Sequence, residues 1–169
     1  MTILPHKEAF IALGSNLGES ATLLDLAFAR LEQFSVVPVR RSSLYRSAPV
    51  DCPPGSPDFL NAVAAIIPKP GETPETLLAK LQQLEREFGR RPKLVLNEPR
   101  PIDLDLITFG GEVRAMVGLI LPHPRAHLRG FVLMPLAELA PELILPGQGR
   151  SVRELLAGLP MDQMPSPIT

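Results

Sequence analysis

Two aspartates on one short run are the residues of this chain best suited to chemistry. Asp103 and Asp105 lie in the run IDLDL (102–106), where apolar and acidic residues alternate with the period of a strand. Two carboxylates on one face repel each other, so they favour a divalent cation such as Mg²⁺. Arg100, just before the run, is suited to bind a phosphate. The pattern predicts metal-assisted phosphoryl chemistry, with a solvated face of an edge strand as the alternative.

Three further segments carry polar residues that need a role. Residues 14–16 (GSN) follow an apolar run and predict a turn, because they lack the spaced glycines and lysine of a P-loop. Residues 89–93 place cations just past a helix end, where they either bind a ligand or complement the helix dipole. Residues 123–129 contain two histidines and two arginines. They favour a phosphate-binding loop over a zinc site, because no cysteine is near.

Composition narrows the class of protein. The chain has 169 residues, of which 45% are hydrophobic, and a net charge of −1, which is typical of one globular domain. Without a basic field we expect no nucleic-acid partner. The single cysteine, Cys52, excludes an internal disulfide and is typical of a reducing compartment. No apolar run is long enough to span a membrane, so we expect a cytoplasmic protein without a membrane partner.

Hydrophobic periodicity predicts the elements that position these residues. We expect strands at 9–13, 36–45, 59–67 and over the aspartate run, and helices capped by Ser20 and Thr73, the second with Pro74 at its first position and Gly89 as its stop. Their order is the split βαβ of ferredoxin-like folds. The fold class is therefore α+β, with a mainly antiparallel sheet, helices on one face and the site on the other. We expect one domain over residues 1–159 and a frayed tail over 160–169.

Six ordered motifs resemble those of one enzyme family. They are IALGSNLG (11–18), SLYRSAPV (43–50), PDFLNA (57–62), PRPIDLD (99–105), LPHP (121–124) and GFVLMPL (130–136). With them the chain resembles the 6-hydroxymethyl-7,8-dihydropterin pyrophosphokinases of folate biosynthesis, from about residue 10 to residue 156. The resemblance implies transfer of pyrophosphate from ATP to the pterin hydroxymethyl group, release of AMP, and two Mg²⁺ ions. Positioning and charge neutralisation dominate such transfers.

The resemblance also assigns roles to individual residues. Catalytic roles fall to Arg90, Arg100, Asp103, Asp105, His123 and Arg129, of which Asp103 and Asp105 hold the metal. Contacts to ATP fall to Gln82, Glu85, Arg100, Leu106 and His123. Contacts to the pterin fall to Ser47, Pro49, Val50, Phe59, Asn61 and Phe131, with Phe59 standing where the family often has tyrosine. The alternatives are core packing for Phe59 and Phe131 and, for Asn61, a buried amide that is bonded to the backbone. For Gln82 and Glu85 the alternative is a solvent-facing position on the helix.

The loop over residues 89–99 departs from the family pattern. Pro92 and Leu96 stand where some members carry arginine, and Arg91 or Lys93 could replace that charge. One alternative is therefore a divergent paralogue that binds pterin or nucleotide with weak or no transfer, and another is an interaction module without a ligand. We expect this loop to be a lid that is mobile when the site is empty. A fixed loop whose leucines pack on the core is the alternative. We expect a monomer, with a dimer as the other possibility.

Overall fold

An antiparallel sheet forms the centre of the computed structural model, which describes residues 7–92 and 94–168. Its strands are β1 (Ala9–Ser15), β2 (Arg40–Arg41), β3 (Tyr45–Ser47), β4 (Phe59–Ile66), β5 (Asp103–Phe109) and β8 (Ser166–Pro167). Their order is β5-β1-β4-β3-β8, and β2 also pairs with β4. β6 (Arg114–Met116) and β7 (Leu119–Leu121) form a separate hairpin. The predicted α+β class with a mainly antiparallel sheet is confirmed.

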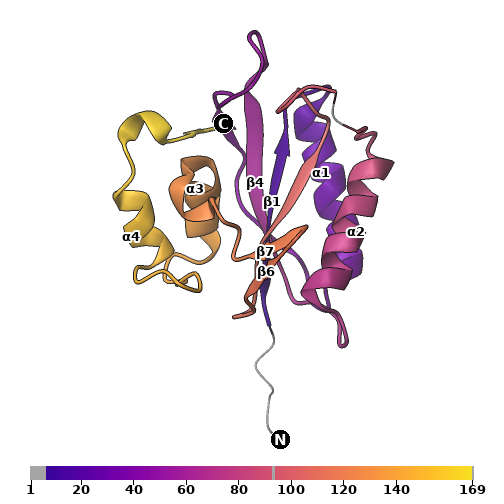
Figure 1. Cartoon of the computed structure of the whole chain (residues 1–169), viewed down its shortest axis with the longest axis vertical. Coiled ribbons are helices and arrows are strands. Elements are labelled where there is room, and N and C mark those ends of the chain that lie inside the picture. Colours follow the sequence, from indigo (N-terminus) through magenta and orange to yellow (C-terminus); the bar gives the residue numbers. More distant parts are fainter. Residues whose placement is uncertain (1–6, 93, 169) are drawn as a thin grey trace, which may run out of the picture.

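Helices cover both faces of this sheet (Figure 1). α1 (Ser20–Leu31) and α2 (Pro74–Glu87) pack on one face, and α3 (Gly130–Leu139) and α4 (Val152–Ala157) lie on the other. Short 3₁₀ turns occupy η1 (Glu32–Phe34), η2 (Ala126–Leu128) and η3 (Met161–Gln163). The prediction of helices on one face only was wrong. α3 is so apolar that it must bury its side chains, and it does so against the second face.

Strand alternation divides the core into two apolar clusters. Ile11, Leu104 and Leu106 pack with the α1 and α2 helices, whereas Phe10 and Ile107 pack with α3. Because successive side chains point to opposite faces, β5 directs its two aspartates away from α1 and α2. The predicted orientation of the aspartate run is therefore confirmed.

α2 forms as its local signals predict. Thr73 is its N-cap and accepts a hydrogen bond from the Thr76 amide at 3.1 Å, and Pro74 occupies the first helical position. Gly89, just beyond the helix, has a φ of +94°, a conformation that glycine adopts without a steric penalty. The helix therefore begins and ends where capping chemistry places it.

Three local predictions were wrong. Ser20 is the first residue of α1 rather than its cap, and it accepts a hydrogen bond from the Ser15 hydroxyl at 2.8 Å. The strand expected at 36–45 is reduced to β2 and the start of β3, because Pro38 interrupts the run and Val36 and Val37 are exposed. The segment expected to be frayed instead forms η3 and β8, and β8 pairs with β3.

Within the described residues, no helix is both long enough and apolar enough to cross a lipid bilayer.

Candidate active site

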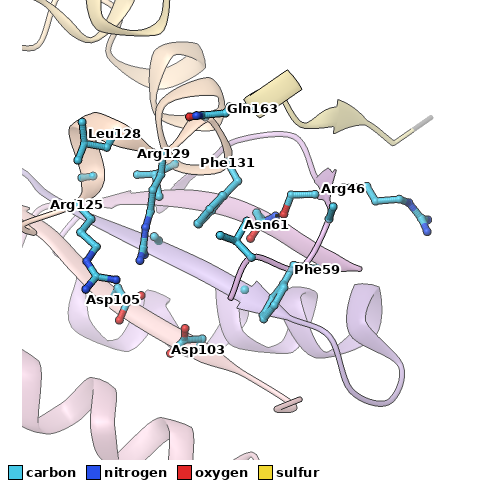
Figure 2. Close-up of a pocket in the computed structure, with 18 of the residues that line it drawn as sticks. Arg46, Phe59, Asn61, Asp103, Asp105, Arg125, Leu128, Arg129, Phe131 and Gln163 are labelled. Carbon is cyan, nitrogen blue, oxygen red and sulfur yellow. Dashed lines mark hydrogen bonds between the residues drawn. The ribbon is translucent and has the colours of Figure 1, made fainter. Parts of the chain in front are cut away.

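A cavity of about 630 Å³ lies on the α3 side of the sheet. Its lining comes from β1, β4 and β5, from the loop that follows β3, and from the segment that leads into α3 (Figure 2). Ten of the residues that the sequence selected line it together: Ser47, Val50, Phe59, Asn61, Arg100, Asp103, Asp105, His123, Arg129 and Phe131. Residues from five of the six motifs therefore meet in one place.

One end of the cavity combines aromatic rings with a buried amide. Figure 2 shows Phe59 and Phe131 lying around Asn61. Asn61 is only 5% exposed, and its amide nitrogen donates a hydrogen bond to the Ser47 hydroxyl at 2.7 Å. Gly14 pairs with Asn61 across β1 and β4, so no side chain from β1 covers the Asn61 oxygen. This end can therefore hold a flat ring and bond to its edge.

The other end is acidic and is organised by one arginine. Arg90 Nη1 lies 2.5 Å from Asp103 Oδ1 and 3.0 Å from Glu85 Oε1. Glu85 Oε1 also accepts a hydrogen bond from the Leu104 amide at 2.7 Å, which ties α2 to β5. The predicted site residues Arg90 and Glu85 therefore lie beside the cavity, where Arg90 contacts Asp103 and Glu85 contacts Arg90 and the next residue of β5.

Burial shifts the pKa values of two carboxyl groups at the acidic end, those of Asp105 and Glu85. It raises the pKa of Asp105, and the negative charges of Asp103 and Glu85 raise it further. Burial likewise raises the pKa of Glu85. A carboxyl whose pKa is raised in this way is held at a free-energy cost at neutral pH, and a bound cation would remove that cost. Among the described residues, no cluster of three or more His, Cys, Asp or Glu could hold a metal.

Cationic groups face the aspartates. Figure 2 shows Arg125 and Arg129 extending toward Asp105 from the segment before α3. The buried Arg100 Nε lies 3.5 Å from an Asp103 oxygen but has no hydrogen-bond partner within the described residues. A buried guanidinium nitrogen without a bond favours an anionic ligand, because an unpaired buried donor is costly.

His123 adds a neutral imidazole to this end. Burial lowers the pKa of His123, and the nearby Arg129 charge lowers it further. Its Nδ1 accepts a hydrogen bond from the Arg125 amide at 3.2 Å. A neutral ring that accepts at Nδ1 carries its proton on Nε2, so His123 can donate a hydrogen bond to a ligand.

Five of the predicted residues do not line this cavity: Pro49, Gln82, Glu85, Arg90 and Leu106. Gln82 is exposed on α2, and Leu106 is buried in the core on the α1 and α2 side. Pro49 is half-buried in the loop after β3. Arg90 lines a smaller hollow of about 410 Å³ that shares Arg100 with the cavity.

The loop over residues 89–99 presents its apolar residues to solvent. Leu94 is 91% exposed and Leu96 is 75% exposed. The alternative of leucines packed on the core is therefore wrong. Lys93 lies outside the described residues, so its predicted role is not addressed.

Asn16 is bonded to the cavity residue Arg100, a contact that the sequence prediction missed. It is 3% exposed, and its side-chain oxygen accepts a hydrogen bond from the Arg100 amide at 2.9 Å. Its backbone amide donates to the Arg100 carbonyl at 3.2 Å, and its side-chain nitrogen donates to the Pro57 carbonyl at 3.3 Å. The turn after β1 therefore holds Arg100 in place. The signal was an asparagine at the end of a buried strand.

The sequence of the chain matches a known protein family. A family described as 7,8-dihydro-6-hydroxymethylpterin-pyrophosphokinase matches residues 10–141. A Pseudomonas aeruginosa protein named 2-amino-4-hydroxy-6-hydroxymethyldihydropteridine pyrophosphokinase is 41% identical over 159 residues, which cover 92% of this chain and 94% of that protein. A Haemophilus influenzae protein of the same name is 40% identical over 139 residues, covering 82% and 84%.

Solved structures agree at the level of the fold. A crystal structure of HPPK-DHPS in complex with substrates matches 91% of this chain with a TM-score of 0.71 and 12% identity. The Plasmodium falciparum HPPK-DHPS with pteroate matches 89% with a TM-score of 0.68 and 13% identity. The chain spans 43% and 42% of those two longer chains. With the family match and the relatives above, the chain belongs to the 7,8-dihydro-6-hydroxymethylpterin-pyrophosphokinase family.

Proposed function

We propose that this protein transfers the pyrophosphoryl group of ATP to the hydroxymethyl group of 6-hydroxymethyl-7,8-dihydropterin and releases AMP, with Mg²⁺ as the metal. The observation that carries the proposal is the single cavity that joins an aromatic, amide-bearing end to an acidic, arginine-bearing end. A flat pterin suits the first end, and a triphosphate with its cations suits the second. The family match supports the same substrates.

Asp103 and Asp105 would hold two Mg²⁺ ions together with phosphate oxygens and water. Carboxylate oxygens are the ligands that Mg²⁺ prefers, and it is commonly bound by one or two of them plus substrate phosphates. The ions would neutralise charge on the transferred group and on the departing AMP. Asp103 is bonded to Arg90 in the ligand-free structure, so Arg90 must release this oxygen or share it when a cation binds.

The phosphates would be positioned by Arg100, Arg129 and His123. Arg100 lines the cavity next to Asp103, and Arg129 reaches the cavity beside Asp105 (Figure 2). His123 contributes the Nε2 proton of a neutral ring, which bonds a phosphate oxygen without adding a further charge. The chemistry needs no protein nucleophile, since the hydroxymethyl oxygen attacks the β-phosphorus and the bond between the α- and β-phosphates breaks.

The pterin would be held by Asn61, Ser47, Phe59 and Phe131. Asn61 supplies both a donor and an acceptor for the ring edge, and Ser47 fixes its orientation through the 2.7 Å bond. Phe59 and Phe131 would stack on the ring faces. Because Phe59 lacks a hydroxyl, this position contributes packing without a hydrogen bond.

A product assay tests the proposal. The protein is incubated with ATP, Mg²⁺ and 6-hydroxymethyl-7,8-dihydropterin, and the nucleotide products are separated by chromatography. We expect one AMP for each pterin pyrophosphate and no ADP. Binding of both substrates without AMP would indicate a paralogue that has lost transfer. The cytoplasmic location and the monomeric state stay predictions, which cell fractionation and light scattering would check.

A further inference from the structure

The last residues of the chain return to the sheet beside the cavity. We call residues 160–168 the C-terminal tail; they lie beyond the part of the chain that the family matches, which ends at residue 141. The tail leaves α4 and runs back toward the strands (Figure 1). There Ser166 pairs with Arg46 and Pro167 with Tyr45, and the Ile168 amide donates a hydrogen bond to the Leu44 carbonyl at 3.1 Å.

The tail backbone lies against the first residue of α3. A Cβ atom on Gly130 would clash with the Gln163 carbonyl oxygen, and it would lie only 3.4 Å from Pro165 Cδ. Gly130 is therefore required by this close approach. The next residue is Phe131, and in the view of Figure 2 Phe131 lies between Gln163 and Asn61.

The tail is also part of the cavity itself. Asp162, Gln163, Met164 and Ser166 line it, as do Arg46 and Ser47 of the strand with which the tail pairs. Ser47 is bonded to Asn61, and in Figure 2 Gln163 and Arg46 lie on the side of Phe131 and Asn61 rather than beside the aspartates. The tail therefore contacts the part of the site that the proposed function assigns to the pterin.

The two ends of α3 are fixed in different ways. At its C-terminal end, Glu138 accepts hydrogen bonds from the Ser43 amide at 3.1 Å and from the Tyr45 hydroxyl. At its N-terminal end, Arg129 is the N-cap and makes no side-chain capping bond. The tail lies against this second end, which carries Phe131, through the close approach of the Gln163 carbonyl to Gly130.

We propose that the C-terminal tail is a positioning element that holds Phe131 against the pterin ring and so sets the affinity for the pterin. The inference rests on the proposed function, because it takes the aromatic end to be the pterin site. A ring that stacks on a ligand must be held close to its productive geometry, and small displacements of a binding group are costly. The tail would supply this constraint without contacting the nucleotide.

Deletion of residues 160–169 is the direct test. Calorimetry would measure the Kd of 6-hydroxymethyl-7,8-dihydropterin and, separately, of a non-hydrolysable ATP analogue, and thermal unfolding would give Tm. We expect the pterin Kd to rise on the order of tenfold and the analogue Kd to stay within about twofold. Equal weakening of both ligands would overturn the proposal, because it would mean that the tail only supports the fold.

Two combined variants show whether the tail acts through α3. Gly130→Ala should raise the pterin Kd in the full chain but not further in the truncated chain, where the Gln163 carbonyl is gone. In a Phe131→Ala background, deletion of the tail should leave the pterin Kd unchanged, because the positioned ring is absent. If the losses of pterin affinity caused by the two changes in either pair were additive, the proposal would be overturned.

A milder pair of substitutions covers the case in which the truncated chain does not fold. Ile168→Pro removes the amide that donates to Leu44, whereas Ile168→Ala keeps it and serves as the matched control. We expect a weaker pterin affinity only for the proline variant, and equal pterin Kd values in both would overturn the role of the tail. If the wild-type protein binds no pterin, the proposed function fails, and the inference fails with it. Wild-type binding that every tail variant retains overturns the inference alone.

Discussion

Replacing Asp105 with asparagine should stabilise the ligand-free protein while it removes activity. Burial, together with the charges of Asp103 and Glu85, raises the pKa of the Asp105 carboxyl from 3.8 to about 7. Asparagine has the same shape but never ionises, so it relieves the repulsion. It is also a poorer ligand for Mg²⁺ than a carboxylate, so transfer should fall by roughly 10²-fold or more.

The sign of the stability effect follows from the two states of this carboxyl. In the unfolded chain it loses its proton near its ordinary pKa, whereas in the folded chain it keeps the proton until about pH 7. The folded state therefore binds more protons across this window, and the free energy of unfolding falls as pH rises through it. A rise of the pKa from 3.8 to about 7 corresponds to a loss of roughly 4 kcal/mol in the free energy of unfolding. Because the open cavity admits water, we expect a gain of about 1–3 kcal/mol at pH 8.

Urea denaturation with a chelator present measures this gain. Wild type, Asp105→Asn and the control Asp25→Asn, whose carboxylate is 74% exposed on α1, would be compared at pH 5 and pH 8. The gain of Asp105→Asn over wild type should be larger at pH 8, and the control should match wild type at both. Added Mg²⁺ should stabilise wild type at pH 8 but not Asp105→Asn. An Asp105→Asn protein that is less stable than wild type at pH 8 without metal would refute the reasoning.

Three further predictions concern the same cavity. Asn61→Ala should weaken pterin binding by roughly 1–3 kcal/mol, because the partners on the ring edge lose their bonds. The affinity for an ATP analogue should barely change in calorimetry, and equal losses of both ligands would make Asn61 structural. Asp103→Asn should leave the circular dichroism spectrum unchanged but remove most turnover, so a near wild-type rate at limiting Mg²⁺ would contradict its role as a ligand. Amide exchange over residues 90–98 should slow when ATP analogue and pterin bind together, since the exposed loop would then close over them. Equal protection with and without ligands would exclude a lid.

The parts of the fold that the sequence predicted well are those with local causes. The alternation along β5 put Asp103 and Asp105 on one face because side-chain direction in a strand depends only on neighbouring residues. The start of α2 at Pro74 and its stop near Gly89 came from capping chemistry within one turn of each end. Such signals are readable because no distant contact has to agree with them.

The missed features depend on contacts between distant residues. Asn16 meets Arg100 across 84 positions, and a GSN turn by itself gives no sign of that partner. The tail is predicted to be frayed because terminal residues are commonly poorly ordered, yet it pairs with β3. Most of the predicted residues that belong to family motifs line the cavity. Leu106 does not, because the alternation that turns Asp105 toward the cavity turns Leu106 to the core.

Asp103 and Asp105 lie on the same face of β5, but they differ in their charged partners. Asp103 is bonded to Arg90 and lies 3.5 Å from Arg100, whereas Asp105 has no ion-pair partner within 4 Å in the described part of the chain. Arg90 Nη1 contacts Asp103 and Glu85 rather than Asp105. In the ligand-free site Asp105 therefore lacks a direct ion pair, at the position where the proposed cations would bind. A protein selected for stability alone would replace a carboxyl group whose pKa is raised by burial and by the charges of Asp103 and Glu85, so this group at this position favours a role in binding a ligand.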